Sequence, residues 1–363
     1  MSGRIRPAVD ALKAYDASRP QARVRLDSHE NPWDLPAGIK RKALARLRSL
    51  EFNRYPDPSA ARLKELLASY AGEGDGDVAP SQIVLGNGSD ELIQYLLLTL
   101  DGEGAVVPTP SFSMYAVTGA VCGARPILVP LSGNYELPAG DVIAASKGAR
   151  VVFIAYPNNP TGNCFDRAAV ERVLDEAACT VVVDEAYFEF SGKTFVHEVA
   201  SRQNLVVLRT LSKGFGLAGI RLGYAVAPPP IAEALEKVRL PYNIGALGQA
   251  VAECALAEPE GFLRRAGKLR RERKRLARAL SKLQGVTPFP SDANFILFRT
   301  AAPAGDLHAA LLRRGVLVKN LDGPGTEGCL RVTVGTRQEN DAFLEALGGA
   351  EGGARGALEE VLA

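Results

Sequence analysis

The residues best suited to chemistry lie in segment 210–221, Thr-Leu-Ser-Lys-Gly-Phe-Gly-Leu-Ala-Gly-Ile-Arg. Lys213 follows an apolar run, residues 205–208, that predicts a buried strand, and it precedes a glycine-rich turn. A lysine amine becomes nucleophilic at neutral pH when it is partly desolvated or lies near another positive charge, which Arg221 can supply. With the hydroxyl of Ser212, these groups can hold a phosphorylated carbonyl compound such as pyridoxal phosphate. On its own, a Ser-Lys-Gly triplet is more often an exposed lysine in a turn.

Two other apolar runs also end in polar side chains. Asp184 ends the run 181–183, and Asn159 follows the run 151–155. Such residues commonly cap turns. In a pyridoxal enzyme, however, a carboxylate there keeps the pyridine nitrogen protonated, so that the ring can accept electrons from the substrate Cα. Asn159 and Tyr187 can hydrogen-bond the phenolic oxygen of the ring, although a turn asparagine and a packed aromatic fit these positions equally well.

A short strand at residues 83–86 turns through Asn-Gly-Ser-Asp-Glu into an apolar helix. We expect Ser89 or Asp90 to cap this helix, whose first N–H groups then face the strand end. A simple cap explains the pattern, and a phosphate cradle at the helix N-terminus is the functional alternative. Phe112 follows the next strand and can stack on a cofactor ring. A phenylalanine that is simply buried in the core would give the same sequence pattern.

The composition is that of an ordinary globular protein. The 363 residues are 47% hydrophobic and 23% charged, with a net charge of +2, so neither nucleic acid nor an acidic membrane is an expected partner. The N-terminal residues show no signal peptide and no apolar run is long enough to span a membrane, so we expect a cytoplasmic protein. Five scattered cysteines and three dispersed histidines predict neither a disulfide framework nor a metal site.

Apolar strand-like runs alternate with helical patterns as far as about residue 230. This alternation predicts an α/β fold with a mostly parallel sheet covered by helices on both faces, followed by a smaller α+β domain. We expect an N-terminal arm over 1–31 that joins the small domain and a large cofactor-binding domain over 32–258. The small C-terminal domain is expected over 259–348, and a tail over 349–363.

Four ordered motifs carry a family resemblance: N-N-P-T-G, D-E-A-Y, T-L-S-K-G-F-G-L-A-G-I-R-L-G-Y and L-R-V-T-V-G-T. In this order they resemble the fold type I pyridoxal-phosphate aminotransferases. Together with R-Y-P-D-P and G-N-G-S-D-E they look most like the histidinol-phosphate aminotransferases, over about residues 15–336. The resemblance implies amino transfer between L-glutamate/2-oxoglutarate and histidinol phosphate/imidazole-acetol phosphate in histidine biosynthesis. An aromatic amino-acid aminotransferase and a phosphothreonine decarboxylase of the same subfamily are the alternatives.

The resemblance also implies roles for the cofactor-binding residues. Lys213 would bond covalently to the cofactor aldehyde and then move the proton between substrate and cofactor, while Asp184 would pair with the pyridine nitrogen. Tyr187 would hold the phenolic oxygen with Asn159. The phosphate would be held by Ser89, the backbone of Asp90, Ser212 and Arg221.

Further implied roles concern the substrate and the partner subunit. Tyr55 would reach the cofactor phosphate of the partner, which implies an obligate homodimer with shared sites. Arg331 would bind the amino-acid carboxylate or the substrate phosphate, and Tyr15 and Asn31 would contact the substrate. The sequence departs from the family pattern at Phe112, where tyrosine is frequent, and at His29, where asparagine is common. We expect both changes to alter substrate preference and to leave the electron-withdrawing chemistry intact.

Overall fold

A seven-stranded sheet organises the computed structural model, which describes residues 5–14, 20–74 and 77–350. The strand order is β2-β8-β7-β6-β5-β3-β4, and every neighbouring pair is parallel except the two pairs that include β8. The strands are β2 (Ile83–Gly86), β3 (Gly104–Thr109), β4 (Arg125–Pro130), β5 (Ala149–Ala155), β6 (Thr180–Asp184), β7 (Leu205–Thr210) and β8 (Gly223–Val226).

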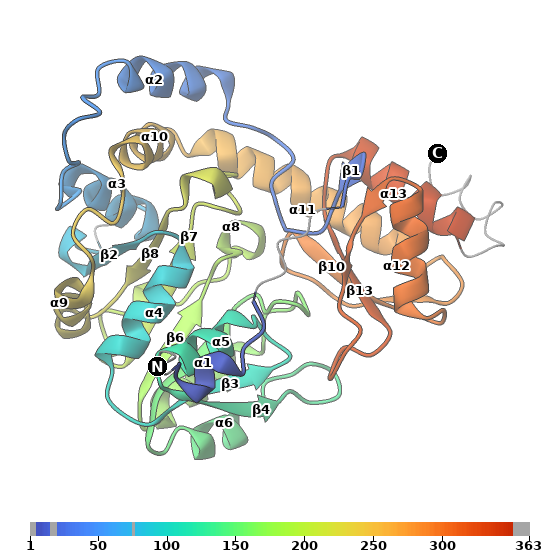
Figure 1. Cartoon of the computed structure of the whole chain (residues 1–363), viewed down its shortest axis with the longest axis horizontal. Coiled ribbons are helices and arrows are strands. Elements are labelled where there is room, and N and C mark those ends of the chain that lie inside the picture. The colour runs from blue at the N-terminus through green and yellow to red at the C-terminus, as the bar shows by residue number, and fades with distance from the viewer. Residues whose placement is uncertain (1–4, 15–19, 75–76, 351–363) are drawn as a thin grey trace.

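Both faces of this sheet are buried. Along β6, Val181 and Val183 enter one hydrophobic core while Val182 enters another, because successive side chains of a strand point to opposite faces. Helices cover the two faces, as Figure 1 shows, and thereby confirm the predicted α/β fold. The first core is closed by α2 (Ala37–Leu47), α3 (Ala61–Ala71), α6 (Ala139–Ala145), α7 (Arg167–Glu176) and α10 (Ala246–Leu256), and the other by α4 (Ser89–Thr99), α5 (Met114–Val121) and α9 (Pro229–Val238).

The C-terminal part of the chain builds a separate hydrophobic core around an antiparallel sheet of order β12-β13-β10-β9. Val24 and Leu26 are buried in this core, because β1 pairs in parallel with β11. This arrangement supports the division into an arm, a large domain and a small domain, whose boundaries stay a prediction. The elements are β1 (Val24–Arg25), α11 (Glu260–Leu280), β9 (Val286–Pro288), β10 (Phe295–Thr300), α12 (Ala304–Arg313), β11 (Val316–Leu317), β12 (Lys319–Asn320), β13 (Cys329–Thr333) and α13 (Arg337–Ala350).

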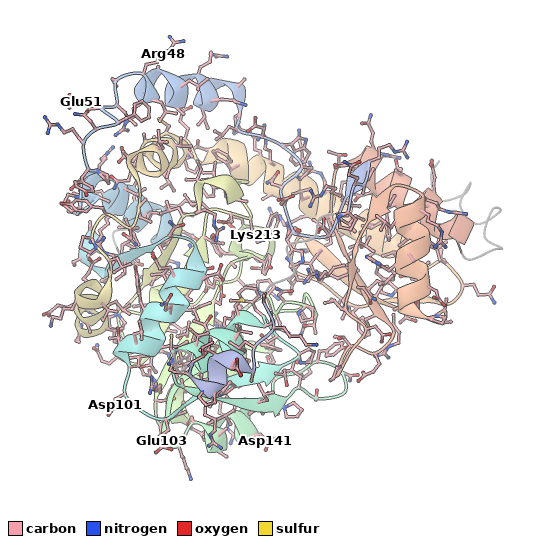
Figure 2. All side chains as sticks on the ribbon, viewed as in Figure 1. Arg48, Glu51, Asp101, Glu103, Asp141 and Lys213 are labelled. Atoms are coloured by element: carbon pink, nitrogen blue, oxygen red, sulfur yellow. The ribbon has the colours of Figure 1, made fainter. Side chains whose placement is uncertain are left out.

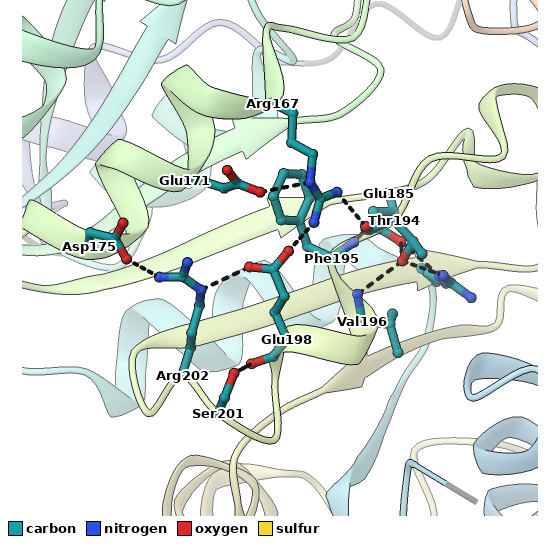
Figure 3. Close-up of polar contacts among 11 residues, drawn as sticks. Arg167, Glu171, Asp175, Glu185, Thr194, Phe195, Val196, Glu198, Ser201 and Arg202 are labelled. Atoms are coloured by element: carbon teal, nitrogen blue, oxygen red, sulfur yellow. Dashed lines mark hydrogen bonds and ion pairs between the residues drawn. The ribbon is translucent and has the colours of Figure 1, made fainter. Parts of the chain in front are cut away.

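A buried ion pair stabilises the segment after β6. Arg209 Nε donates to Glu185 Oε2 at 3.0 Å, and the Glu185 carboxylate also accepts hydrogen bonds from Phe195 N and the Thr194 hydroxyl (Figure 3). These bonds offset the cost of removing a carboxylate from water. The remaining helices are α1 (Pro7–Asp10) and α8 (Phe188–Ser191), with single 3-10 turns at Pro80–Gln82, Val196–Glu198 and Ala218–Ile220. Within the described ranges, no helix combines the length and apolar character needed to cross a membrane.

Candidate active site

Three of the predicted site residues meet at one edge of the large sheet. Lys213 follows β7, Asp184 ends β6 and Asn159 follows β5, and these three strands are parallel neighbours. The carboxyl ends of parallel strands lie at the same edge, which is where open α/β sheets bind ligands. Figure 2 shows Lys213 near the middle of the molecule, between the large sheet and the C-terminal elements.

The Lys213 amine lies in surroundings that favour its neutral form. The side chain is half-buried, and its Nζ donates a hydrogen bond to the backbone oxygen of Ser28 at 3.2 Å. Burial lowers the pKa of Lys213 to about 8, and the positive charges of Arg331 and Arg221 contribute to this shift. A far larger fraction of this amine is therefore unprotonated near pH 8 than in an exposed lysine.

The turn that carries Lys213 requires its glycines. A Cβ on Gly214 would lie 2.5 Å from the Glu189 carboxylate, and a Cβ on Gly216, where φ is +66°, would lie 2.9 Å from Asn31 Cβ. Asn31 Nδ2 donates to the Gly214 carbonyl at 3.2 Å, and Asn31 Oδ1 accepts from Trp33 N at 3.1 Å. The carboxamide of Asn31 thus holds the turn in place, and its contact with substrate stays a prediction.

Asp184 is a buried carboxylate with two hydrogen-bond donors. The Tyr115 hydroxyl donates to Oδ2 at 2.6 Å, and Ala186 N donates to Oδ1 at 3.1 Å. Burial raises the pKa of Asp184 to about 6, while the Tyr115 hydrogen bond acts in the opposite direction. Tyr115 belongs to none of the sequence motifs that predict a site role. The half-buried Phe112 lies edge-on to the Tyr115 ring, with centroids 5.5 Å apart, so it lies near this carboxylate.

The first turn of α4 forms an anion-binding geometry with Arg221. The helix begins at Ser89 with Gly88 as its N-cap at φ +80°, and no side chain caps it, so the predicted cap at Ser89 or Asp90 is wrong. A Cβ on Gly88 would lie 2.4 Å from Arg221 Nη2, and one on Gly223 would lie 2.5 Å from Ser89 N. Close backbone approach therefore brings a guanidinium and the free N–H groups of a helix N-terminus together.

Two further polar contacts surround this helix N-terminus. Arg221 Nη2 lies 3.4 Å from Asp90 Oδ2, and both side chains are about half exposed. The buried Ser212 hydroxyl lies 3.0 Å from Thr210 Oγ1, which accepts a hydrogen bond from Ser212 N at 3.1 Å. Ser212 therefore has a defined backbone position next to the same strand edge.

Arg331, on β13, reaches the site from the C-terminal sheet. Its Nη1 donates to Asn159 Oδ1 at 2.5 Å, and its Nη2 donates to the Asp27 carbonyl oxygen at 3.2 Å. Its Nε is buried without a hydrogen-bond partner among the described residues. Burial lowers the pKa of Arg331 to about 10. A desolvated, incompletely paired guanidinium is well suited to bind an anionic group.

Tyr187 and His29 form a buried polar pair beside Arg331. His29 Nδ1 lies 2.8 Å from the Tyr187 hydroxyl, and burial raises the pKa of Tyr187. Both rings pack against Phe295, with centroid distances of 4.1 Å for His29 and 5.2 Å for Tyr187. The sequence pointed to His29 only as a departure from a family pattern, and its contact with Tyr187 was not foreseen.

Tyr55 lies on the surface of its own chain. Its side chain is 80% exposed and stacks on Tyr242 with ring centroids 4.4 Å apart. Tyr15, the other aromatic residue assigned to the site, lies outside the residues that the structure describes. The predicted contributions of Tyr55 to a partner subunit and of Tyr15 to substrate binding therefore stay predictions.

Comparisons with known proteins agree on one family. Residues 23–347 match the family model for aminotransferase class I and II. The chain is 44% identical to histidinol-phosphate aminotransferase 2 of Nitrosococcus oceani, over 94% of this chain and 96% of that protein. It is 41% identical to the histidinol-phosphate aminotransferase of Aquifex aeolicus, over 93% and 96% of the two chains. The crystal structure of the Clostridium acetobutylicum histidinol-phosphate aminotransferase superposes with a TM-score of 0.82 at 26% identity, covering 90% of this chain and 99% of that one. The chain therefore belongs to the aminotransferase class I and II family, whose members are pyridoxal-phosphate-dependent transaminases.

Proposed function

We propose that this enzyme transfers the amino group between L-glutamate/2-oxoglutarate and histidinol phosphate/imidazole-acetol phosphate, in histidine biosynthesis. The observation that carries the proposal is the extent of the likeness to histidinol-phosphate aminotransferases, which reaches 41–44% identity over more than nine-tenths of both chains. The geometry at the strand edge supports it, because a nucleophilic amine, a buried carboxylate and anion-binding groups meet there.

The chain's own residues fit pyridoxal phosphate. Gly88 lies against the Arg221 guanidinium, and Gly223 lies against the first N–H of α4. These two donors would bind the cofactor phosphate, together with Ser212. Lys213, with its lowered pKa, would bond to the aldehyde carbon. Asp184 would pair with the pyridine nitrogen, Asn159 and Tyr187 would hold the phenolic oxygen, and Phe112 would stack on the ring.

When bound, the cofactor supplies an electron-withdrawing ring that stabilises negative charge at the substrate Cα. Asp184 is needed as an anion, and Tyr115 favours that form by donating a hydrogen bond to Oδ2. Lys213 Nζ, once free of its covalent bond, would take the proton from the substrate Cα and deliver it to the former aldehyde carbon of the cofactor, and a pKa of about 8 suits both steps near neutral pH. The Ser28 carbonyl and the Asn31-held turn keep this amine in position.

Arg331 is the proposed anchor for the substrate anion, either the glutamate carboxylate or the phosphate of histidinol phosphate. Its contacts with Asn159 and Asp27 orient the guanidinium, and neither contact is with a carboxylate, so the positive charge remains available to the ligand. Tyr15 and Asn31 are proposed to contribute to the same substrate pocket. A bidentate guanidinium suits both kinds of anion, so Arg331 by itself does not select between the two substrates.

A panel of amino donors and acceptors, phosphorylated and unphosphorylated, tests the substrate proposal. We expect glutamate and imidazole-acetol phosphate to react with the highest kcat/KM, and unphosphorylated aromatic 2-oxo acids to react more slowly. Absence of amino transfer from glutamate to imidazole-acetol phosphate would refute the proposal. Carbon dioxide release from phosphothreonine would instead identify a decarboxylase. The Lys213→Ala variant should retain the cofactor without a covalent bond, and retained turnover in it would contradict the assigned nucleophile.

We also propose a homodimer in which Tyr55 reaches the cofactor phosphate of the partner subunit. Its 80% exposure supports this arrangement, because an exposed aromatic side chain is free to contact a partner subunit. Tyr242, which stacks on Tyr55, is also exposed, and so are Phe52, Leu240 and Leu247 elsewhere in the described residues. The expected cytoplasmic location stays a prediction that cell fractionation can test.

A further inference from the structure

His29 is a buried titratable residue to which the proposed chemistry gives no task. Only 3% of its surface is exposed, and its ring is stacked on Phe295 with an interplanar angle of 14°. Its backbone N donates to Thr333 Oγ1 and its carbonyl accepts from Asn294 Nδ2, each at 3.0 Å. Stacking and backbone contacts thus set the ring direction, and Nδ1 lies 2.8 Å from the Tyr187 hydroxyl.

The direction of this hydrogen bond depends on which ring nitrogen of His29 carries the proton. Burial and the nearby charges of Arg331 and Lys213 lower the pKa of His29, so the ring is neutral and carries a single N–H. Nε2 is buried without a hydrogen-bond partner among the described residues. A proton on Nε2 would leave a donor unsatisfied, whereas a proton on Nδ1 leaves only an unused acceptor. Orphaned buried N–H groups are the rarer case, so the N–H belongs on Nδ1.

We propose that His29 is a positioning residue that donates from Nδ1 to the Tyr187 oxygen and thereby leaves the Tyr187 proton free to point into the cofactor pocket. This inference rests on the proposed function, in which Tyr187 donates to the phenolic oxygen of the cofactor. If the Tyr187 hydroxyl instead donated its proton to His29, no proton would lie between the Tyr187 oxygen and the phenolic oxygen of the cofactor, and the two oxygens could not form a hydrogen bond. The donated bond also polarises the Tyr187 hydroxyl and strengthens it as a donor.

Asparagine is the matched conservative replacement at this position. Its Nδ2 is a donor at about the reach of histidine Nδ1, and asparagine tolerates the left-handed backbone of His29, where φ is +57°. Leucine offers no donor. His29→Asn should therefore preserve the orientation of Tyr187, and His29→Leu should remove it. Any backbone strain from leucine is the same with and without the Tyr187 hydroxyl, so a double-mutant cycle with Tyr187→Phe cancels it.

The first test uses the apoprotein with 15N-labelled histidine. The ring nitrogen shifts should show His29 neutral with its proton on Nδ1, and the His29→Asn spectrum assigns the signals. The Tyr187→Phe variant should perturb those signals. A neutral ring protonated on Nε2, or a charged ring, would overturn the inference without bearing on the enzyme's activity.

The second test is a pH titration of the absorbance of the bound cofactor. His29→Leu should raise the midpoint pH of this titration by roughly half a pH unit, which corresponds to the loss of one hydrogen bond. His29→Asn should leave the midpoint pH near that of the unmodified enzyme. In the Tyr187→Phe background, His29→Leu should cause no further shift. If Tyr187→Phe shifts the midpoint and His29→Leu does not, the positioning role is wrong. If Tyr187→Phe has no effect, the assigned role of Tyr187 itself fails.

Discussion

The Tyr115 hydroxyl donates a 2.6 Å hydrogen bond to Oδ2 of Asp184, and both groups are buried. The carboxylate ends β6 and the tyrosine lies on α5, so the contact joins the strand edge to the helix layer. Burial is the main cause that raises the pKa of Asp184, and this hydrogen bond opposes the rise. Tyr115 therefore helps to keep the proposed partner of the pyridine nitrogen ionised.

We expect Tyr115→Phe to lower activity mainly on the acidic side. A hydrogen bond to a charged group is worth about 1.5–3 kcal/mol, so its loss should move the acidic limb of the kcat/KM profile upward by about one unit or more. Activity near pH 8 should change much less. The control is Tyr95→Phe, because Tyr95 is a buried tyrosine on α4 whose hydroxyl contacts Leu240 N instead. A uniform loss at all pH values would contradict the explanation.

Asp184→Asn should stabilise the apoprotein while abolishing most activity. The folded-state pKa of about 6 lies above the ordinary value of 3.8, so the folded protein binds the proton more tightly than the unfolded chain. The ionised carboxylate therefore costs stability above pH 6, by up to about 3 kcal/mol, and this cost falls as the pH drops through 6. Urea unfolding should show that the gain from asparagine shrinks by about 2 kcal/mol between pH 8 and pH 4.5. A gain independent of pH would exclude this cause.

Gly88→Ala should weaken cofactor binding. The new Cβ would meet Arg221 Nη2, and φ of +80° strains any residue other than glycine, at a cost of about 1–3 kcal/mol. We expect roughly a tenfold loss of pyridoxal phosphate affinity, as measured by absorbance titration of the apoprotein. Gly219→Ala is the matched control near Arg221, because no atom lies within 4 Å of its added Cβ. Equal losses in both variants would show that the Gly88 contact is not responsible.

Hybrid dimers should reveal whether the site is shared. Lys213→Ala and Tyr55→Phe subunits, each of low activity alone, would form a hybrid in which one site has both native residues. Mixing after reversible dissociation should therefore restore activity to a fraction of the native dimer, because intact Lys213 and intact Tyr55 come from different subunits. If mixing restores nothing although hybrid formation is verified by mass spectrometry, Tyr55 does not serve the partner subunit.

The sequence by itself determined the α/β class and predicted most of the residues that the fold brings to the candidate site. Apolar runs of strand length ending in Asp184, Asn159 and the Lys213 turn predicted neighbouring strand ends, because parallel strands must bring such ends to one edge. The ordered motifs added the expected roles of Arg221 and Arg331, which stay predictions. Each of these signals depends on a few adjacent residues, so the sequence alone is enough to recognise it.

Only the tertiary structure decided which buried polar groups are paired. Tyr115 meets Asp184 across 69 positions and His29 meets Tyr187 across 158, and no local pattern encodes such contacts. The predicted cap of α4 differs from the observed one because the helix begins after Gly88, whose φ of +80° and close contact with Arg221 suit only glycine. Burial, hydrogen-bond direction and pKa depend on what surrounds a side chain in space, so they emerge when distant segments pack together.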